Sequence, residues 1–260
     1  MRFTLQFPMR AVARYGTWVG DGHLADVAAL AEEAGFDAVA MTDHPFPEDA
    51  WLAAGGHHAF DPFVALSFMG AATRRVRLLT NVLVAPYRNP YLAAKAIGSL
   101  DVLSGGRAVV GLAAGYLRAE FAAVGADFDG RGGRVDAAVR AMRAAWTGTS
   151  VDHDDPHFGV HGHTMLPAPL QRPGPPIWIG GNSGRARRRA VELGDGWMPF
   201  PAPPPLARIT GTAVLDSLDR LAALVAGVQE RRAAAGAAPL DVAFVPFEDQ
   251  RDVAAGAPAL

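Results

Sequence analysis

The sequence predicts an α/β fold, a (β/α)8-type TIM barrel formed by a single domain over residues 1–260. Short apolar runs alternate with amphipathic stretches along almost the whole chain. The runs are apolar on both faces, as are the strands of a parallel sheet that helices cover. Seven such runs over this length favour a barrel over an open doubly wound sheet. No G-x-G-x-x-G follows the first run and no P-loop motif occurs, which disfavours a nucleotide-binding open sheet.

Each predicted element follows from a local pattern. The apolar runs predicted as strands are residues 3–7, 38–42, 76–84, 108–113, 177–179, 196–198 and 241–247. Apolar residues at helical spacing predict helices after Asp21, from Asp61 to about Thr73, from Asn89 to Gly105, over 135–146, 184–193 and 218–228. The starts at Asp61 and Asn89 each combine a capping side chain with a following proline. Residues 199–205 are proline-rich and are predicted as a link.

Two segments depart from the alternation. Residues 151–176 are rich in proline, histidine and glycine, so we expect an inserted loop or hairpin before the fifth strand. The polar side chains of this insertion fit no zinc-ligand spacing, so we expect a solvated loop and no metal: His153, Asp154, Asp155, His157, His161 and His163. The tail, residues 248–260, has no eighth apolar run, so we expect another element to cover the open edge.

The amino-acid composition argues against nucleic acid and anionic membranes as binding partners. Half of the residues are hydrophobic and the formal net charge is −2, a balance that gives no electrostatic footprint for nucleic acid or for an anionic membrane. The chain has no cysteine, which excludes disulfides, thiolate nucleophiles and cysteine-ligated metal centres. We find no apolar stretch long enough for a signal peptide or a membrane span, so we expect a cytoplasmic protein.

Polar residues at the carboxyl ends of the predicted strands are the candidate site, because TIM barrels place their chemistry there. Asp43-His44 follows the second strand, and a histidine at this rim can exchange a proton with a substrate. The alternative is a hydrogen-bonded structural histidine. Asn81-Val82 lies late in the third strand, where a polar residue indicates a bulge, a ligand contact or a satisfied core amide. Gly115-Tyr116 follows the fourth strand.

The turn after the fifth strand, Gly180-Gly181-Asn182-Ser183, carries the sharpest local signal. Its two glycines let the backbone approach a ligand closely, and the amides that open the next helix bind anions. Ser183 can add a hydroxyl donor. The alternative is a tight turn in which Ser183 only caps the helix.

The segment between the second strand and Asp61 contains a further set of candidates. His57 and His58 follow two glycines, which is typical of a flexible loop. Aromatic residues of the same segment are predicted to line an apolar substrate mouth: Phe46, Trp51 and Phe60.

Several stretches in order along residues 1–200 resemble the luciferase-like monooxygenase superfamily, specifically its F420-dependent oxidoreductase class. The matching stretches are residues 34–38, 42–44, 77–84, 103–107, 111–120, 176–183 and 193–197. The resemblance implies a TIM barrel with an insertion before strand five, which agrees with the pattern above. It also implies a deazaflavin or flavin lying across the top of the barrel.

The resemblance assigns roles to the candidate residues. It implies that His44 lies near the reactive ring as proton donor or substrate polariser, and that Asp43 lies in the cofactor site. Asn81-Val82 matches a bulge that in many members holds a non-proline cis peptide behind the ring. Gly115 and Tyr116 match a loop lining the cofactor pocket. The phosphate turn of the family matches Gly180, Gly181, Asn182 and Ser183.

The sequence therefore predicts an oxidoreductase that transfers a hydride between coenzyme F420 and a small organic substrate. Tyr116 stands where some F420-dependent sugar-phosphate dehydrogenases carry a catalytic glutamate, which argues against that particular chemistry. An FMN-dependent monooxygenase of the same superfamily is the first alternative, because both cofactors carry a phosphate-bearing chain. A non-catalytic flavin-binding protein is the second. The resemblance further implies a homodimer.

Overall fold

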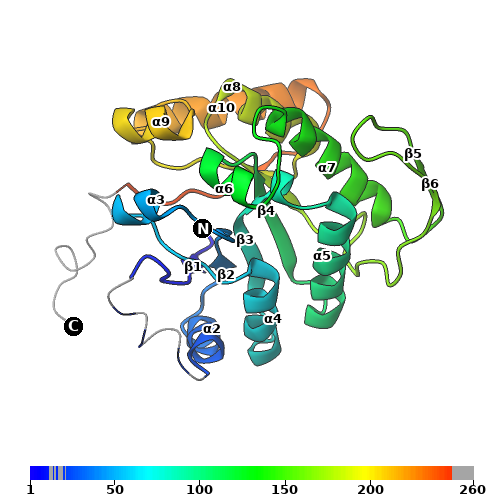
Figure 1. The fold of residues 1–260 in the computed structure, drawn as a ribbon, viewed down its shortest axis with the longest axis horizontal. Coiled ribbons are helices and arrows are strands. Elements are labelled where there is room, and N and C mark those ends of the chain that lie inside the picture. The colour runs from blue at the N-terminus through cyan, green and yellow to red at the C-terminus, as the bar shows by residue number, and fades with distance from the viewer. Residues whose placement is uncertain (12–13, 15, 17–19, 21, 248–260) are drawn as a thin grey trace. The chain divides into compact units, whose positions relative to one another are not determined.

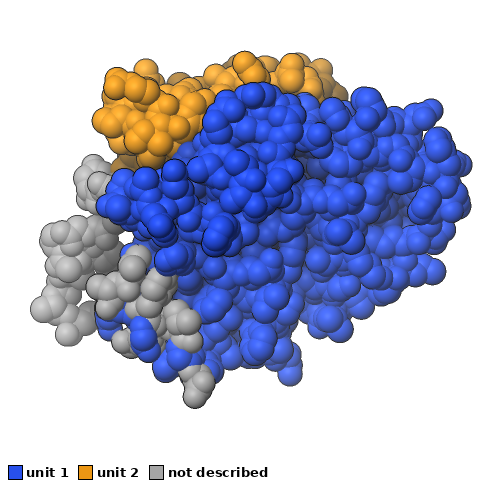
Figure 2. Space-filling model, in the orientation of Figure 1, with its two compact units in different colours: residues 1–177 blue, residues 178–260 orange. Residues whose placement is uncertain are grey.

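The computed structural model describes residues 1–11, 14, 16, 20 and 22–247. The chain divides into two compact units, residues 1–177 and residues 178–260, which Figure 2 shows in blue and orange. Each unit is described by itself.

The first unit is built on four parallel strands in sequence order. These strands are β1 (Thr4–Gln6), β2 (Ala38–Met41), β3 (Arg77–Val84) and β4 (Ala108–Ala113). Leu5 pairs with Val39, Ala40 with Leu79, and Leu79 with Val109, so neighbouring strands end at the same edge. All four were predicted from their apolar runs, and β4 has the predicted bounds.

Helices cover the strands of the first unit, as Figure 1 shows. They are α2 (His23–Glu33), α4 (Pro62–Ala72), α5 (Pro90–Ser104) and α7 (Arg131–Ala145). The capping signals at Asp61 and Asn89 work as predicted, because each side chain accepts a hydrogen bond from the first turn of its helix. Helix α5 ends at Gly105 with φ of 77°. The predicted cap Asp21 lies outside the described residues.

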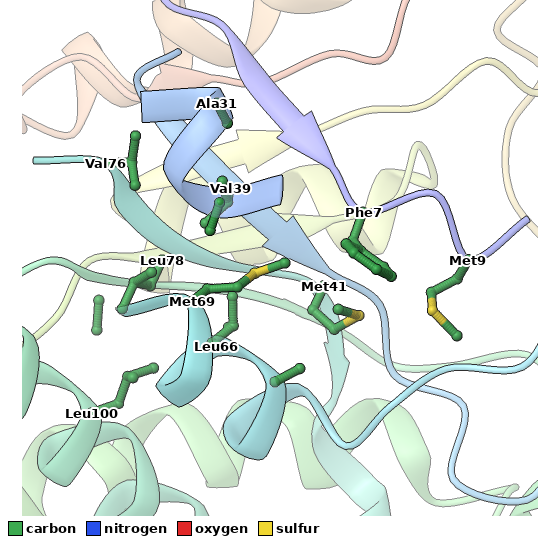
Figure 3. Packing of buried hydrophobic residues seen from close by; sticks show 13 residues of the cluster. Phe7, Met9, Ala31, Val39, Met41, Leu66, Met69, Val76, Leu78 and Leu100 are labelled. Carbon is green, nitrogen blue, oxygen red and sulfur yellow. The ribbon is translucent and has the colours of Figure 1, made fainter. Parts of the chain in front are cut away.

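The core of this unit lies between α2, α4 and the strands. Figure 3 shows Leu66 and Met69 of α4 facing Val39 and Leu78, which project from β2 and β3. All four side chains are at most 1% exposed. Burial of this apolar surface holds the strands in register and so fixes where their carboxyl ends lie.

Three short helices follow the carboxyl ends of the strands and were not predicted. They are α3 (Asp49–Ala53) after β2, η2 (Ala85–Tyr87) directly after β3, and α6 (Arg118–Ala123) after β4. Each is too short to show the apolar periodicity on which the sequence prediction depended. They carry much of the candidate site.

The inserted segment contains an antiparallel strand pair, β5 (Val151–His153) and β6 (Val160–His163). The chain after this hairpin is tied to the body of the unit through the buried Asp101. Its carboxylate accepts hydrogen bonds from the backbone N–H of Gln171 at 3.0 Å and from the Gln171 side chain at 2.6 Å. A Cβ on Gly174 would lie 2.5 Å from the Trp146 ring, so the returning chain passes closely over that indole.

As far as residue 247, the second unit has three parallel strands and three helices. The strands are β7 (Ile177–Gly180, which begins at the last residue of the first unit), β8 (Gly196–Met198) and β9 (Asp241–Val242). The helices are α8 (Gly184–Leu193), α9 (Pro204–Thr210) and α10 (Leu218–Ala234). Helix α8 and strand β8 have their predicted bounds, whereas α9 occupies part of the stretch predicted as a link.

The seventh strand is shorter than predicted. Residues 241–247 were expected to form it, but only Asp241 and Val242 pair with β8. Gln229 of α10 holds the start of this strand, because its side chain both accepts from and donates to the backbone of Leu240. No strand follows β9 as far as residue 247, where the described chain ends.

Candidate active site

The carboxyl ends of β2, β3 and β4 bring together a group of polar side chains within the first unit. His44 follows β2, Tyr87 lies in η2 after β3, and Glu120 lies in α6 after β4. Parallel strands that end at one edge make this convergence possible, although the three residues are far apart in sequence.

His44 contacts a buried carboxylate. Its Nδ1 lies 3.2 Å from Oε2 of Glu120, whose side chain is only 1% exposed. The Tyr87 hydroxyl donates to the same oxygen at 2.9 Å, and the Phe46 N–H donates to Oε1 at 3.1 Å. The His44 side chain is 12% exposed, so it is less deeply buried than the carboxylate that it contacts.

The electrostatics favour an ionised Glu120. Burial raises the pKa of this carboxyl, but the contacts from His44, Tyr87 and the Phe46 N–H outweigh it and hold the pKa below its ordinary value. Tyr87 shifts in the opposite sense, because burial and the neighbouring Glu120 charge raise the pKa of its hydroxyl. Tyr87 therefore remains a neutral donor to a charged acceptor.

Aromatic rings fix the His44 imidazole from two further sides. The Trp51 ring lies 4.6 Å from it between centroids, at an interplanar angle of 34°. The His57 ring meets it edge-on at 5.0 Å. His57 Nδ1 lies 2.9 Å from the carbonyl oxygen of His58, and burial lowers the pKa of this histidine. His57 is therefore a neutral neighbour.

Asp43, the residue before His44, has a buried side chain. Its Oδ2 accepts from the backbone N–H of Val84 at 2.9 Å, and both of its oxygens are bound by Arg88. Asp43 thus ties the end of β2 to the end of β3. A direct contact between Asp43 and a cofactor stays a prediction.

The structure confirms the bulge expected at Asn81-Val82. Thr80 pairs with Val110 and Leu83 pairs with Leu112, so β3 advances three residues where β4 advances two. The Asn81–Val82 peptide bond is cis. The Asn81 side chain donates to Oε1 of Gln6 at 2.6 Å, which links β3 to the end of β1. The role of this pair toward a cofactor stays a prediction.

Gly115 and Tyr116 form the loop between β4 and α6. Gly115 has φ of 75°, and a Cβ there would lie 2.6 Å from Cγ1 of Val84 and 2.9 Å from the ring of Phe121, so no other residue fits. Arg131 of α7 donates to the Gly115 carbonyl at 3.3 Å. Burial raises the pKa of Tyr116, while a hydrogen bond with Trp51 opposes the shift.

In the second unit, the turn after β7 leads into the N-terminus of α8. Gly181 has φ of 111°. The backbone N–H groups of Gly181 and Asn182 are bonded within the unit, to the Met198 carbonyl at 3.1 Å and to the Thr212 hydroxyl at 2.9 Å. The first-turn N–H groups of Gly184 and Arg185 have no acceptor within α8. A helix N-terminus of this kind suits an anion, and binding of a phosphate here stays a prediction.

Asn182 and Ser183 have structural partners in this turn. The Asn182 side chain donates to the Phe200 carbonyl at 2.8 Å and accepts from the Phe200 N–H at 3.1 Å. Ser183 caps α8 by accepting from the Ala186 N–H at 3.2 Å, which is the alternative that the sequence left open. The Ser183 hydroxyl still has its proton to donate.

Sequence reasoning missed three residues of the site: Tyr87, Arg88 and Glu120. Glu120 lies within one of the stretches that carry the family resemblance, residues 111–120, which follow the fourth predicted strand. This position was the one feature of the sequence that could have marked Glu120 as a site residue. The substrate mouth stays a prediction. Trp51 contacts His44 as described, Phe46 is exposed, and the partly buried Phe60 packs on the core residue Phe7 with ring centroids 6.4 Å apart.

The described residues hold no group of three or more histidine, cysteine or acidic side chains arranged to bind a metal ion. Within the same residues, no helix combines the length and hydropathy needed to cross a bilayer.

Parallel strands covered by helices, with polar side chains gathered at the carboxyl ends of the strands, are typical of α/β-barrel proteins. The luciferase-like monooxygenase family model matches residues 1–247. The chain belongs to this family.

Individual relatives divide between two cofactors. An F420-dependent glucose-6-phosphate dehydrogenase of Nocardia farcinica is 34% identical over 184 residues, which cover 69% of this chain and 53% of the relative. An FMNH(2)-dependent dimethylsulfone monooxygenase of Pseudomonas putida is 34% identical over 128 residues, covering 48% of this chain and 35% of the relative. The chain thus spans about half the length of the first relative and about a third of the second.

A solved structure has a similar fold. The monooxygenase RslO1 of Streptomyces bottropensis superposes with a TM-score of 0.77 at 27% identity, covering 94% of this chain and 70% of that chain. The fold predicted from the sequence is therefore confirmed as that of the luciferase-like barrels.

Proposed function

We propose that this chain is the core of an F420-dependent oxidoreductase that moves a hydride between the deazaflavin and a small organic substrate. The contact of His44 with buried Glu120 at the end of β2 carries the proposal. The 34% identity to an F420-dependent dehydrogenase supports the choice of cofactor.

Each group has one task in this proposal. When bound, F420 supplies a two-electron carrier that takes up or releases a hydride. As an alcohol carbon loses a hydride, its hydroxyl loses a proton, and His44 takes that proton. In the reverse direction His44 returns the proton to the carbonyl oxygen. The Trp51 ring packs on His44, and Tyr116 hydrogen-bonds to Trp51, so both residues hold the imidazole in place.

The remaining cofactor contacts are part of the same proposal. Gly180, Gly181, Asn182 and Ser183 hold the phosphate, supported by the position of this turn at the N-terminus of α8. Asn81, Val82, Gly115, Tyr116 and Asp43 form the ring site. The proposal includes a single barrel domain, a homodimer and a cytoplasmic location.

The substrate is proposed to differ from that of the Nocardia relative, which is named for a sugar phosphate. Tyr116 occupies the place where the resemblance expects a catalytic glutamate for sugar-phosphate oxidation. The monooxygenase of Pseudomonas supports a second candidate function, an FMN-dependent monooxygenase.

Titration of the purified protein with F420 and with FMN, followed by fluorescence, tests the proposal. Tight binding of F420 alone supports it, preference for FMN transfers support to the monooxygenase, and binding of neither by a folded protein supports a non-catalytic role. His44→Ala should keep cofactor affinity and lose turnover of small alcohols or carbonyl compounds. His163→Ala, an exposed histidine on β6, is the control and should change neither. Full turnover by His44→Ala would refute the catalytic assignment.

A further inference from the structure

We propose that Glu120 is the positioning residue that holds His44 in the Nδ1–H tautomer, so that Nε2 is the nitrogen that exchanges a proton with the substrate. The first half concerns the protein alone, whereas the second half rests on the proposed function. Neither half follows from the family match or from the names of the relatives.

The Glu120 carboxylate meets several hydrogen-bond donors. Three donors or potential donors meet one carboxylate: the Phe46 N–H at Oε1, and the Tyr87 hydroxyl and His44 Nδ1 at Oε2. An ionised carboxylate has no proton to give, so a nitrogen 3.2 Å from it must carry the hydrogen. His44 Nδ1 is therefore the protonated nitrogen of the neutral ring.

The other neighbours of His44 do not compete for this proton. His57 meets the ring edge-on, and its own Nδ1 points to the His58 carbonyl at 2.9 Å, which only accepts. Asp43, the acidic residue next to His44 in the chain, is bound on both oxygens by Arg88. Trp51 fixes the plane of the ring without hydrogen-bonding to it. Of the charged and titratable groups around the ring, Glu120 alone contacts Nδ1.

The consequence is an imidazole in which Nδ1 is the hydrogen-bond donor and Nε2 is the acceptor. Nε2 lies on the opposite side of the imidazole from Nδ1, so it faces away from the carboxylate and carries the free lone pair. A base must present that lone pair to the hydroxyl proton it removes. The other tautomer would place a hydrogen on Nε2, and the substrate proton would have no acceptor.

Nitrogen NMR of histidine-labelled, cofactor-free protein tests the tautomer directly. The spectrum is recorded near pH 8.5, roughly two units above the ordinary histidine pKa, and His44→Gln assigns the signal by its loss. The proposal expects a protonated Nδ1 and an unprotonated Nε2 in the parent protein. An Nε2–H signal from His44, or an equal mixture of tautomers, overturns it.

Variants at Glu120 and Tyr87 then isolate the cause. Glu120→Gln replaces the acceptor-only carboxylate with an amide that also donates, so the His44 signal should move toward a mixture of tautomers. Tyr87→Phe is the matched control, because it removes a donor from the same oxygen and keeps the charge, so His44 should remain Nδ1–H. An unchanged tautomer in folded Glu120→Gln would refute the assignment, as would equal effects of both variants.

Turnover provides the second readout. Glu120→Gln should lower kcat on the order of 10²-fold, in the range of a lost acid–base contribution, with little change in KM. Glu120→Asp keeps the charge and should recover at least a tenth of the parent kcat, whereas His163→Ala, at an exposed residue of β6, should leave kcat unchanged. A loss confined to KM would contradict a positioning role. If His44→Ala turns over normally while the parent tautomer is Nδ1–H, the proposed function fails and the structural half of this proposal stands.

Discussion

Arg88 binds Asp43 through both terminal nitrogens, with Nη1 2.6 Å from Oδ2 and Nη2 2.8 Å from Oδ1. The Asp43 side chain is 1% exposed, so its charge depends on this guanidinium and on the Val84 N–H. The guanidinium also lies 3.5 Å from the helix-capping Asp61. One arginine thus ties the ends of β2 and β3 to the start of α4, next in the chain to His44 through Asp43.

Arg88→Met should lower the free energy of unfolding by about 3 kcal/mol, because it leaves a buried carboxylate without its counter-charge. Urea denaturation measures the loss. Arg220→Met is the control, since the Arg220–Asp216 pair is exposed and at i,i+4 spacing, and it should lose no more than about 0.5 kcal/mol. Equal losses of unfolding free energy in the two variants would show that the buried Arg88–Asp43 pair stabilises the fold no more than the exposed pair does.

Gly115→Ala tests the close approach in the loop after β4. The alanine Cβ would lie 2.6 Å from Cγ1 of Val84, and the alanine backbone would have to adopt the left-handed conformation of Gly115. Gly125→Ala is the matched control, because Gly125 has φ of 69° but no atom within 4 Å of the added Cβ. We expect Gly125→Ala to cost about 1–2 kcal/mol of stability and Gly115→Ala about 1–3 kcal/mol more. Thermal and urea unfolding measure both, and indistinguishable values would contradict the packing argument.

The pH dependence of stability should report on Glu32. Burial raises the pKa of this carboxyl, but hydrogen bonds from the backbone N–H groups of Val76, Arg75 and Arg74 lower it to a net value below the ordinary one. Because the folded pKa is depressed, the contribution to stability is present above about pH 4.5 and is lost as the pH falls through the folded pKa.

Glu32→Gln should therefore destabilise more at pH 7 than near pH 4, as measured by urea unfolding across that range. Glu33→Gln changes the net charge equally at an exposed position of the same helix and serves as control. A constant difference between Glu32→Gln and the parent at all pH values would count against the assignment.

Asn182→Asp should loosen the phosphate-type turn of the second unit. The aspartate would place an oxygen against the Phe200 carbonyl, to which the Asn182 amide now donates at 2.8 Å. We expect a loss of about 2 kcal/mol, within the range for a buried polar atom left unpaired. Ser183→Ala removes only the α8 cap and should cost about 1 kcal/mol.

Amide hydrogen exchange should locate this effect. Asn182→Asp is expected to reduce protection at Phe200 and at Ala202, whose N–H bonds to Leu215 in the neighbouring segment. Unchanged protection at these amides, together with normal stability, would mean that the turn does not depend on the Asn182 side chain.

The sequence was sufficient for elements whose cause is local. Strand β4 follows from a run of apolar residues, and the starts of α4 and α8 follow from Asp61-Pro62 and Ser183. Helices α3 and α6 lacked periodicity because they are one or two turns long. The seventh strand was overpredicted, because an apolar run does not reveal where pairing with a neighbour ends.

The candidate site was predictable only in part, for a related reason. His44 was found because it follows a strand end, which is a property of the chain order. Its partner Glu120 is 76 residues away, and Arg88 is 45 residues from Asp43. Only the parallel register of β2, β3 and β4 brings these charges together. From the sequence alone, a buried acidic residue in the first turn of a helix cannot be distinguished from a solvent-exposed one.

The tie between Asp101 and Gln171 and the close passage of Gly174 over Trp146 fix the chain that returns from the hairpin. The segment between β5 and β6 is held as well, because the Tyr91 hydroxyl donates to the Phe158 carbonyl at 2.6 Å. We therefore expect an insertion there to disturb a bonded segment, whereas a small label on the exposed side chain of His161 in β6 leaves these anchors in place. Strand β6 is a practical attachment point for immobilising the protein on a sensor surface.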